Sequence, residues 1–206
     1  MTQYDNQYYI AHTLYTSDQM QPAPDDKTAA RKYRYKKMSA GEAPLIFVNG
    51  FAERDQRTGD QRVVTDIMSD GSSLLVTTDL KDELARYDTQ GMQFYPAIFK
   101  IEDGRWLEDY WYLNFYRTLD CLDRARSILE DDDDEDFPAE VDQYALDANV
   151  LDSIPEEQRM LFKMGGCSKS YVFVHQEIAD YLKQCGATGV KLFPVSDFTE
   201  GDQYEF

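Results

Sequence analysis

A 23-residue segment occurs twice in this chain, and the repetition constrains the fold more than any other feature. The first copy is residues 74–96, LLVTTDLKDELARYDTQGMQFYP, and the second is residues 172–194, VFVHQEIADYLKQCGATGVKLFP. They align without a gap and share five identities: Val76/Val174, Asp82/Asp180, Leu84/Leu182, Gly91/Gly189 and Pro96/Pro194. The ungapped match favours duplication over the convergence of two ordinary amphipathic units, although two copies are too few for a repeat array.

Each copy predicts a strand, a helix and a second strand. Three apolar residues open the copy, as in a buried strand. Apolar residues then recur at i, i+4 and i+7, which places one narrow apolar stripe on a helix: Leu80, Leu84 and Tyr87, or Ile178, Leu182 and Cys185. Alternation with period two follows the shared glycine, and Pro96 or Pro194 closes the strand. If both strands of a copy share a sheet, they run parallel with a right-handed crossover.

Residue types also predict the helix ends. Thr78 or Asp79 can cap the first helix, whereas Gln176 is a weaker cap for the second. Gly186 is suited to end the second helix in the left-handed conformation. Its counterpart is Asp88, which tolerates that conformation better than most residues, so we expect the first helix to end there.

The rest of the chain predicts short strands and turns, so the fold class is α+β, with mixed sheets and short flanking helices. Residues 97–101 and 110–115 flank Asp103-Gly104 and predict a hairpin. Ser153 predicts a helix start, and the polar residues 49–60 predict a loop. Further strand candidates are residues 4–16, 44–48, 144–146 and 160–162, and residues 119–129 fit a short helix or a strand with a turn.

Length and composition predict one domain over residues 1–206, with residues 1–73 and 74–206 as its alternative subdivision. No apolar run approaches the roughly 18 residues that span a membrane. The first residues lack the basic and apolar regions of a secretory signal. Three cysteines without a pair spacing fit reduced thiols in the cytoplasm: Cys121, Cys167 and Cys185.

The chain is strongly acidic, with 39 Asp and Glu against 21 Lys and Arg and a net charge of −18. Such a field repels nucleic acid and anionic membranes and attracts basic partners. Residues 27–37 hold six bases with Tyr33 and Tyr35 between them, a composition that can bind single-stranded nucleic acid. Because the net charge opposes that binding, we expect neither a nucleic acid nor a membrane as partner.

Seven of the acids are consecutive: Glu130, Asp131, Asp132, Asp133, Asp134, Glu135 and Asp136. The usual structure of such a run is a solvated loop. The pattern argues against an EF-hand calcium site, because Asp136 stands where that loop needs glycine.

The search for catalytic groups finds two weak candidates. Cys167 and His175 can in principle form a nucleophile and its base, but such a pair is recognised by geometry and not by spacing. His175 has Thr as its counterpart in the first copy, which indicates a structural role. Asp120 and Asp123 lie three residues apart and can share a helix face, as acid–base catalysis requires. No Cys/His cluster has metal-ligand spacing, and residues 163–170 lack the order of a phosphate loop. We expect no metal or cofactor.

Three blocks of the sequence resemble a known family. They are LKDELARYDTQGMQFYPAIF, YWYLNFYRTLDCLDRARS and YVFVHQEIADYLKQCGATGVKLFPV, which in this order cover residues 74–198. Together they look like the polymorphic-toxin immunity proteins numbered family eleven, and the acidic run looks like an insertion specific to this chain. The resemblance implies a cytoplasmic bacterial protein that protects its producer from a cognate toxin by binding it, with no catalytic residues to carry over.

The hypothesis that combines these observations is an immunity protein that occludes a basic toxin, such as a nuclease. The acidic run Glu130–Asp136 is its predicted contact surface, since complementary charge speeds association. Two alternatives stay open: a small-molecule enzyme using Cys167/His175 or Asp120/Asp123, and a regulatory module that binds no toxin. The sequence leaves the oligomeric state open.

Overall fold

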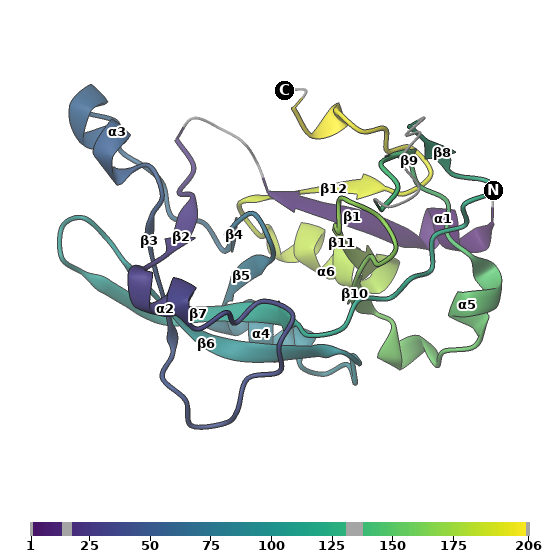
Figure 1. Ribbon diagram of the computed structural model, residues 1–206, viewed down its shortest axis with the longest axis horizontal. Helices are drawn as coiled ribbons and strands as arrows, with labels where there is room; N and C mark the ends of the chain where they lie inside the picture. The colour runs from purple at the N-terminus through teal and green to yellow at the C-terminus, as the bar shows by residue number, and fades with distance from the viewer. Residues whose placement is uncertain (1, 14–17, 131–137, 205–206) are drawn as a thin grey trace.

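The computed structural model describes residues 2–13, 18–130 and 138–204 and has the predicted α+β fold class. Two sheets, one of six strands and one of four, carry most of the strands, and a third sheet has two short strands. Short helices flank them, and none in this part of the chain is long and apolar enough to cross a membrane. Figure 1 shows the six-stranded sheet at the lower left and the four-stranded sheet at the upper right.

The six-stranded sheet is built around the first copy of the repeat. Its strand order is β2-β3-β6-β7-β5-β4, in which β3 and β6 are parallel and the other neighbours antiparallel. Its strands are β2 (Pro22–Pro24), β3 (Leu45–Asn49), β4 (Ile67–Ser69), β5 (Leu74–Thr77), β6 (Met92–Lys100) and β7 (Trp106–Phe115). The helices along this part of the chain are α2 (Asp26–Ala30), α3 (Ala52–Thr58) and α4 (Thr78–Leu84).

The four-stranded sheet is built around the second copy, in the order β10-β11-β1-β12, with all neighbours antiparallel. Its strands are β1 (Tyr8–Thr13), β10 (Leu161–Lys163), β11 (Val172–His175) and β12 (Val190–Pro194), and α6 (Gln176–Cys185) joins the last two. The remaining elements are α1 (Gln3–Gln7), α5 (Ala148–Asp152), the 3-10 helices η1 (Glu156–Gln158) and η2 (Asp202–Tyr204), and the pair β8 (Ile128–Leu129) and β9 (Val141–Gln143).

Both copies form the predicted strand, helix and strand, but each has another strand inserted between its two. The inserted strand is β7 between β5 and β6, and β1 between β11 and β12. Because β7 is antiparallel to both of its partners here, β5 and β6 run parallel; the same holds for β11 and β12 about β1. The parallel direction was predicted. The inserted strand was not, since one comes from a hairpin and the other from the chain's beginning.

The two helices of the copies share one core between the sheets. Leu80 and Leu84 of α4 belong to the same buried cluster as Ile178, Ala179 and Leu182 of α6. Residues of both sheets complete this cluster, and separate apolar clusters cover the opposite sides of the sheets. The predicted stripes are confirmed at their first two positions in each helix, whereas Tyr87 lies beyond the end of α4 and Cys185 is exposed. Full burial of each such leucine contributes roughly 1.5–3 kcal/mol, so this shared core is a main connection between the two copies.

The helix starts lie earlier than the predicted caps. Thr77 is the N-cap of α4 and His175 is the N-cap of α6. His175 Nδ1 accepts a hydrogen bond from the Glu177 N–H at 3.3 Å, which satisfies one of the free donors of the first turn. The equivalence of His175 and Thr77 thus has a structural meaning, because both stand at the junction of strand and helix.

The two helices end differently. Gly186 ends α6 in the left-handed conformation with φ of 70°, as predicted. The prediction for Asp88 is wrong, because α4 stops at Leu84 and its C-cap Ala85 stays right-handed. Tighter bonds close the end of α4 instead, from the Arg86 N–H to the Glu83 carbonyl among others.

A predicted strand end and a predicted helix start are also wrong. Pro96 does not close its strand, since β6 continues to Lys100. Pro96 is tolerated because it pairs with β7 on one side, while β3 joins the other side only from Ala97 onward. Ser153 does not cap the helix that follows it: it is the C-cap of α5, and its Oγ donates to the Val150 carbonyl at 2.6 Å, whereas η1 begins at Glu156 with Pro155 as its N-cap.

The shorter segments give mixed outcomes. The hairpin is confirmed as β6 and β7, and residues 119–129 form the alternative of turn and strand, ending in β8. The expected loop at residues 49–60 is wrong, since it contains α3. The strand expected at residues 144–146 lies just before them, at β9, and Leu146 makes an isolated bridge.

Candidate functional site

Five acidic residues lie where β8, β9 and the C-terminal segment meet, at the upper right of Figure 1. The Glu130 N–H donates to the Glu140 carbonyl at 3.0 Å, and the Glu200 N–H donates to the Asp142 carbonyl at 2.8 Å. Asp202 accepts a hydrogen bond from the Thr199 N–H, and Thr199 bridges to β9. We call these five acidic residues the acidic face: Glu130, Glu140, Asp142, Glu200 and Asp202.

The acidic face combines charge with exposed apolar side chains. Lys169 Nζ lies 3.0 Å from Glu200 Oε1, and this hydrogen bond, with the fields of nearby acids, raises the pKa of Lys169. Ile128 of β8 and Tyr204 of η2 are 49% and 59% exposed. Such a surface suits contact with a protein, because apolar side chains provide buried area and the charges orient the partner.

The predicted contact run is attached to the acidic face. Its first member, Glu130, is exposed at the end of β8. Its other members, Asp131–Asp136, lie outside the described residues. The chain returns to the face at Glu140, so the run connects two strands of the same small sheet.

Cys167 and His175 do not form a dyad. Cys167 precedes β11 and its Sγ donates to the Lys169 carbonyl at 3.4 Å, whereas His175 is the last residue of β11 and packs against Tyr8. Burial raises the pKa of the Cys167 thiol to about 11, which disfavours the nucleophilic thiolate. Burial lowers the pKa of His175, whose ring serves as the cap of α6.

Asp120 and Asp123 are each engaged with a different arginine. Asp120 Oδ2 lies 2.9 Å from a guanidinium nitrogen of Arg124, and Asp123 Oδ2 lies 2.6 Å from Nε of Arg126. The hydrogen bond from Arg126 lowers the pKa of Asp123, which is unsuitable for an acid catalyst near neutral pH. The pair therefore stabilises the turn between residues 119 and 129.

The basic and aromatic segment 27–37 covers an outer face of the six-stranded sheet. Tyr33 is buried there and donates to Asp70 at 2.8 Å, and Arg34 pairs with the same carboxylate at 2.9 Å. Tyr35 lies over the ammonium group of Lys163, with 4.5 Å between Nζ and the ring centre. These contacts are intramolecular, and the burial of Tyr33 removes one of the two rings on which a single-stranded nucleic acid could stack.

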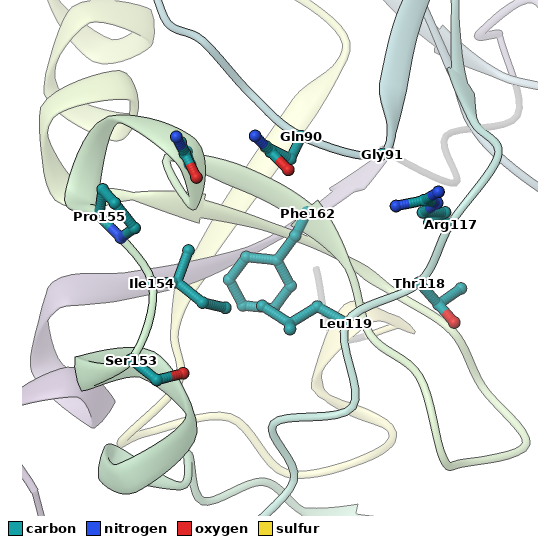
Figure 2. Close-up of a pocket in the computed structure, with 10 residues that line it drawn as sticks. Gln90, Gly91, Arg117, Thr118, Leu119, Ser153, Ile154, Pro155 and Phe162 are labelled. Carbon is teal, nitrogen blue, oxygen red and sulfur yellow. The ribbon is translucent and has the colours of Figure 1, made fainter.

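A cavity of about 260 Å³ opens beside the glycine of the first copy (Figure 2). Its floor is apolar and its rim is polar, with side-chain amides, hydroxyls and one guanidinium. Figure 2 shows Gln90 and Arg117 on one side, Ser153 and Pro155 on the other, and the ring of Phe162 between them. The Gly91 carbonyl accepts the N–H groups of Tyr116 and Arg117, which holds the chain after β7 at the rim.

A larger cavity, of about 720 Å³, lies between α3 and the β6–β7 turn. Asp55 in its wall accepts hydrogen bonds from Arg62 at 2.7 and 2.8 Å and from Asn49 at 2.7 Å. The hydrogen bond from Arg62 lowers the pKa of Asp55 to about 2. Among the residues described, no three His, Cys, Asp or Glu are arranged to hold a metal ion.

A comparison with family models assigns the chain. The model of the Imm11 immunity protein family matches residues 13–197. The chain belongs to this family. A comparison with curated proteins finds no match. Immunity proteins are typically non-catalytic binding proteins, and the family implies a cognate toxin as partner. The match confirms the resemblance seen over residues 74–198 and extends it toward the beginning of the chain.

Sequence reasoning found the acidic run but not the acids around it. Glu200 and Asp202 reach β9 through the bridge between Gln143 and Thr199, which are 56 positions apart. No local sequence pattern predicts a contact between residues so far apart in the chain. The cavity of Figure 2 was missed for the same reason, since its walls come from four separate segments.

Proposed function

We propose that this Imm11 protein neutralises a basic toxin by binding it, and that the acidic face with the run Glu130–Asp136 is the contact surface. The observation that carries the proposal is the position of Glu130, the first member of the run. It lies beside four further acidic residues and two exposed apolar side chains. The negative charge of the run adds a strong local field to the field of the whole chain, whose net charge is −18.

The proposed mechanism is occlusion without catalysis. A basic toxin, such as a nuclease, is attracted by the field, and the apolar residues Ile128 and Tyr204 become buried in the complex. Charge complementarity mainly raises the association rate, which can exceed the rate of neutral pairs by about 100-fold or more at low salt. Coverage of the toxin's active site then blocks its substrate.

Co-expression tests the immunity function. The product of the neighbouring gene should be toxic when expressed alone in the cytoplasm and harmless beside this protein. A product that is harmless alone, or that stays toxic in the presence of this protein, would refute the assignment of that partner. Recovery of a stable complex by size-exclusion chromatography separates binding from indirect protection.

Association kinetics test the contact surface. The variant in which all seven acids of the run become Ser or Asn should associate with the toxin about tenfold more slowly at low salt, with the difference lost at high salt. The matched control removes seven exposed acids elsewhere: Asp26, Glu53, Asp60, Asp88, Glu108, Asp109 and Glu157. Equal slowing in both variants would indicate a general field effect, and unchanged association in the run variant would exclude the run.

A further inference from the structure

The cavity of Figure 2 has one positive charge, on Arg117, that pairs with no acid among the residues that the structure describes. Eight other arginines form ion pairs with carboxylates. The side chain of Arg117 makes no hydrogen bond or ion pair with the residues that the structure describes. Its backbone N–H is held by the Gly91 carbonyl at 3.0 Å, so the residue is fixed at the rim while its guanidinium stays available.

The surroundings of Arg117 keep this charge available. Although 39 of the 206 residues are acidic, no Asp or Glu is among the described residues that line the cavity. Some acids next to the lining segments are engaged: Asp120 pairs with Arg124 at 2.9 Å, and Glu156 with Arg159 at 3.8 Å. Two others, Glu157 and Asp88, are exposed to solvent. More distant acids are screened, because the Debye length is about 8 Å at physiological salt. Arg117 is therefore the one charged residue among the described residues that line the cavity.

The cavity has an apolar floor beside this charge. Leu119, Ile154 and Phe162 form the floor, and Figure 2 shows their side chains converging there. The amides of Gln90 and Gln158 add hydrogen-bonding groups on the rim. A volume of about 260 Å³ is below the usual range for drug-sized ligands, and it suits a ligand about the size of one amino acid.

We propose that this cavity is a binding site for a small carboxylate with an apolar body. Arg117 pairs with the carboxylate, and Leu119, Ile154 and Phe162 bury the apolar part. A guanidinium is well suited to this role, because its planar donors match the two oxygens of a carboxylate. The carboxylate comes from a free aliphatic acid or from the apolar C-terminal residue of a peptide. The site lies apart from the acidic face, so it goes beyond the proposed contact with a toxin.

Titration followed by ¹H–¹⁵N NMR tests the proposal at physiological salt. The probes are 4-methylpentanoate for a free acid, the peptide Ala-Ala-Leu with a free C-terminus, and the same peptide with a C-terminal amide. We expect dose-dependent shifts at Gln90, Gly91 and Arg117 with one or both acids, and at least about tenfold weaker binding of the amide. Shifts with 4-methylpentanoate alone identify a free acid, and shifts with Ala-Ala-Leu identify a peptide end.

Three variants complete the test. Arg117→Gln should weaken binding at least about tenfold, because it removes the charge and keeps a polar side chain. Arg105→Gln, at an exposed ion pair in the β6–β7 turn, is the matched control and should bind normally. Ser153→Trp, at an exposed position of the rim, should block the cavity. No shifts at millimolar probe, or equal binding by Arg117→Gln and the unchanged protein, would overturn the proposal whatever the co-expression result.

Discussion

Gly91 and Gly189 occupy the same position in the two copies, and what lies against them differs. Both have positive φ, of 77° and 88°, and each precedes the second strand of its copy. A Cβ on Gly189 would lie 2.1 Å from the Ile67 carbonyl oxygen and 2.3 Å from Oγ1 of Thr65. A Cβ on Gly91 would meet only Arg117, at 2.9 Å from its Cβ.

The difference shows how one local pattern acquires two roles. In the second copy, the segment that enters β4 fills the space at the glycine, and the Ile67 N–H donates to the Thr188 carbonyl at 3.0 Å. In the first copy, η1 takes the corresponding contact, with the Gln90 N–H donating to the Gln158 carbonyl at 3.2 Å. None of the three atoms nearest to a Cβ on Gly91 belongs to η1, and a cavity lies beside this glycine.

The largest effect is expected for Gly189→Ala. The left-handed φ costs about 1–2 kcal/mol for a non-glycine residue, and overlap with backbone adds about 1–3 kcal/mol. We expect a loss of about 4 kcal/mol in the free energy of unfolding, measured by urea denaturation. Gly186→Ala is the control, because φ is 70° and no atom lies within 4 Å of its Cβ, so about 1 kcal/mol is expected. Equal losses of stability in the two variants would show that the positive φ, and not the overlap with neighbouring atoms, determines the cost.

Leu84→Ala and Leu182→Ala should be nearly equivalent. Both leucines are 5% exposed, at the same position of the two copies and in the same shared core. Removal of a buried leucine side chain costs about 3 kcal/mol, within a range set by how far the cavity collapses. Urea denaturation of the single variants and of the double variant measures the coupling. A difference between the single variants larger than about 1 kcal/mol would contradict the equivalence of the two stripes.

Gly91→Ala should cost less than Gly189→Ala, about 2 kcal/mol, because its Cβ would lie 2.9 Å from Arg117 Cβ, whereas a Cβ on Gly189 would lie 2.1 Å from a backbone oxygen. The same substitution displaces Arg117 and should weaken binding of the carboxylate probe. Gly189→Ala, in contrast, should leave any residual folded protein with normal binding. If only Gly91→Ala lowers both the free energy of unfolding and the affinity for the probe, the two glycines differ as proposed.

The smallest effect concerns the N-caps, through His175→Thr, which places the residue of the first copy in the second. Burial lowers the folded-state pKa of His175 below 6.5, with the nearby Glu156 and Glu177 opposing and Arg159 adding to the shift. The contribution of neutral His175 to the free energy of unfolding is therefore present above pH 6.5. It is lost as the pH falls through the folded-state pKa, because the unfolded chain takes up the proton more readily.

The variant should differ by about 1 kcal/mol or less at pH 7, since threonine is also an N-cap residue. Its stability should fall less steeply between pH 7 and pH 5, as measured by urea denaturation at each pH. Some dependence stays, because burial also lowers the pKa of His12. A steeper fall in the variant would contradict a capping role for neutral His175.

Local pattern was sufficient for the elements of the two copies. The period of apolar residues and the glycine with positive φ act within a few residues, so a strand, a helix and a strand could be predicted twice, although the N-caps were placed too late in the chain. The predictions failed where a segment distant in the sequence determines the local structure. Pro96 stays inside a strand because β3 begins beyond it, and α3 forms although its segment looks like a loop.

The candidate sites depended still more on the fold. The acidic run was visible as a charge pattern, but the acids that surround it come from β9 and from the C-terminal segment. Arg117 gave no signal, because an unpaired arginine differs from a paired one only through its neighbours. Only the folded chain brings Gly91, Arg117 and Phe162 around one cavity.

By itself, then, the sequence determined the two strand–helix–strand units, the strong acidity and the family. The tertiary structure decided which strand separates the halves of each unit, which acids form one face, and which of two equivalent glycines stands beside open space. The physical reason is the range of the interactions. Caps, periodicity and backbone conformation act between residues close in the chain, whereas strand pairing, such as Tyr8 with His175, and cavity formation join residues far apart.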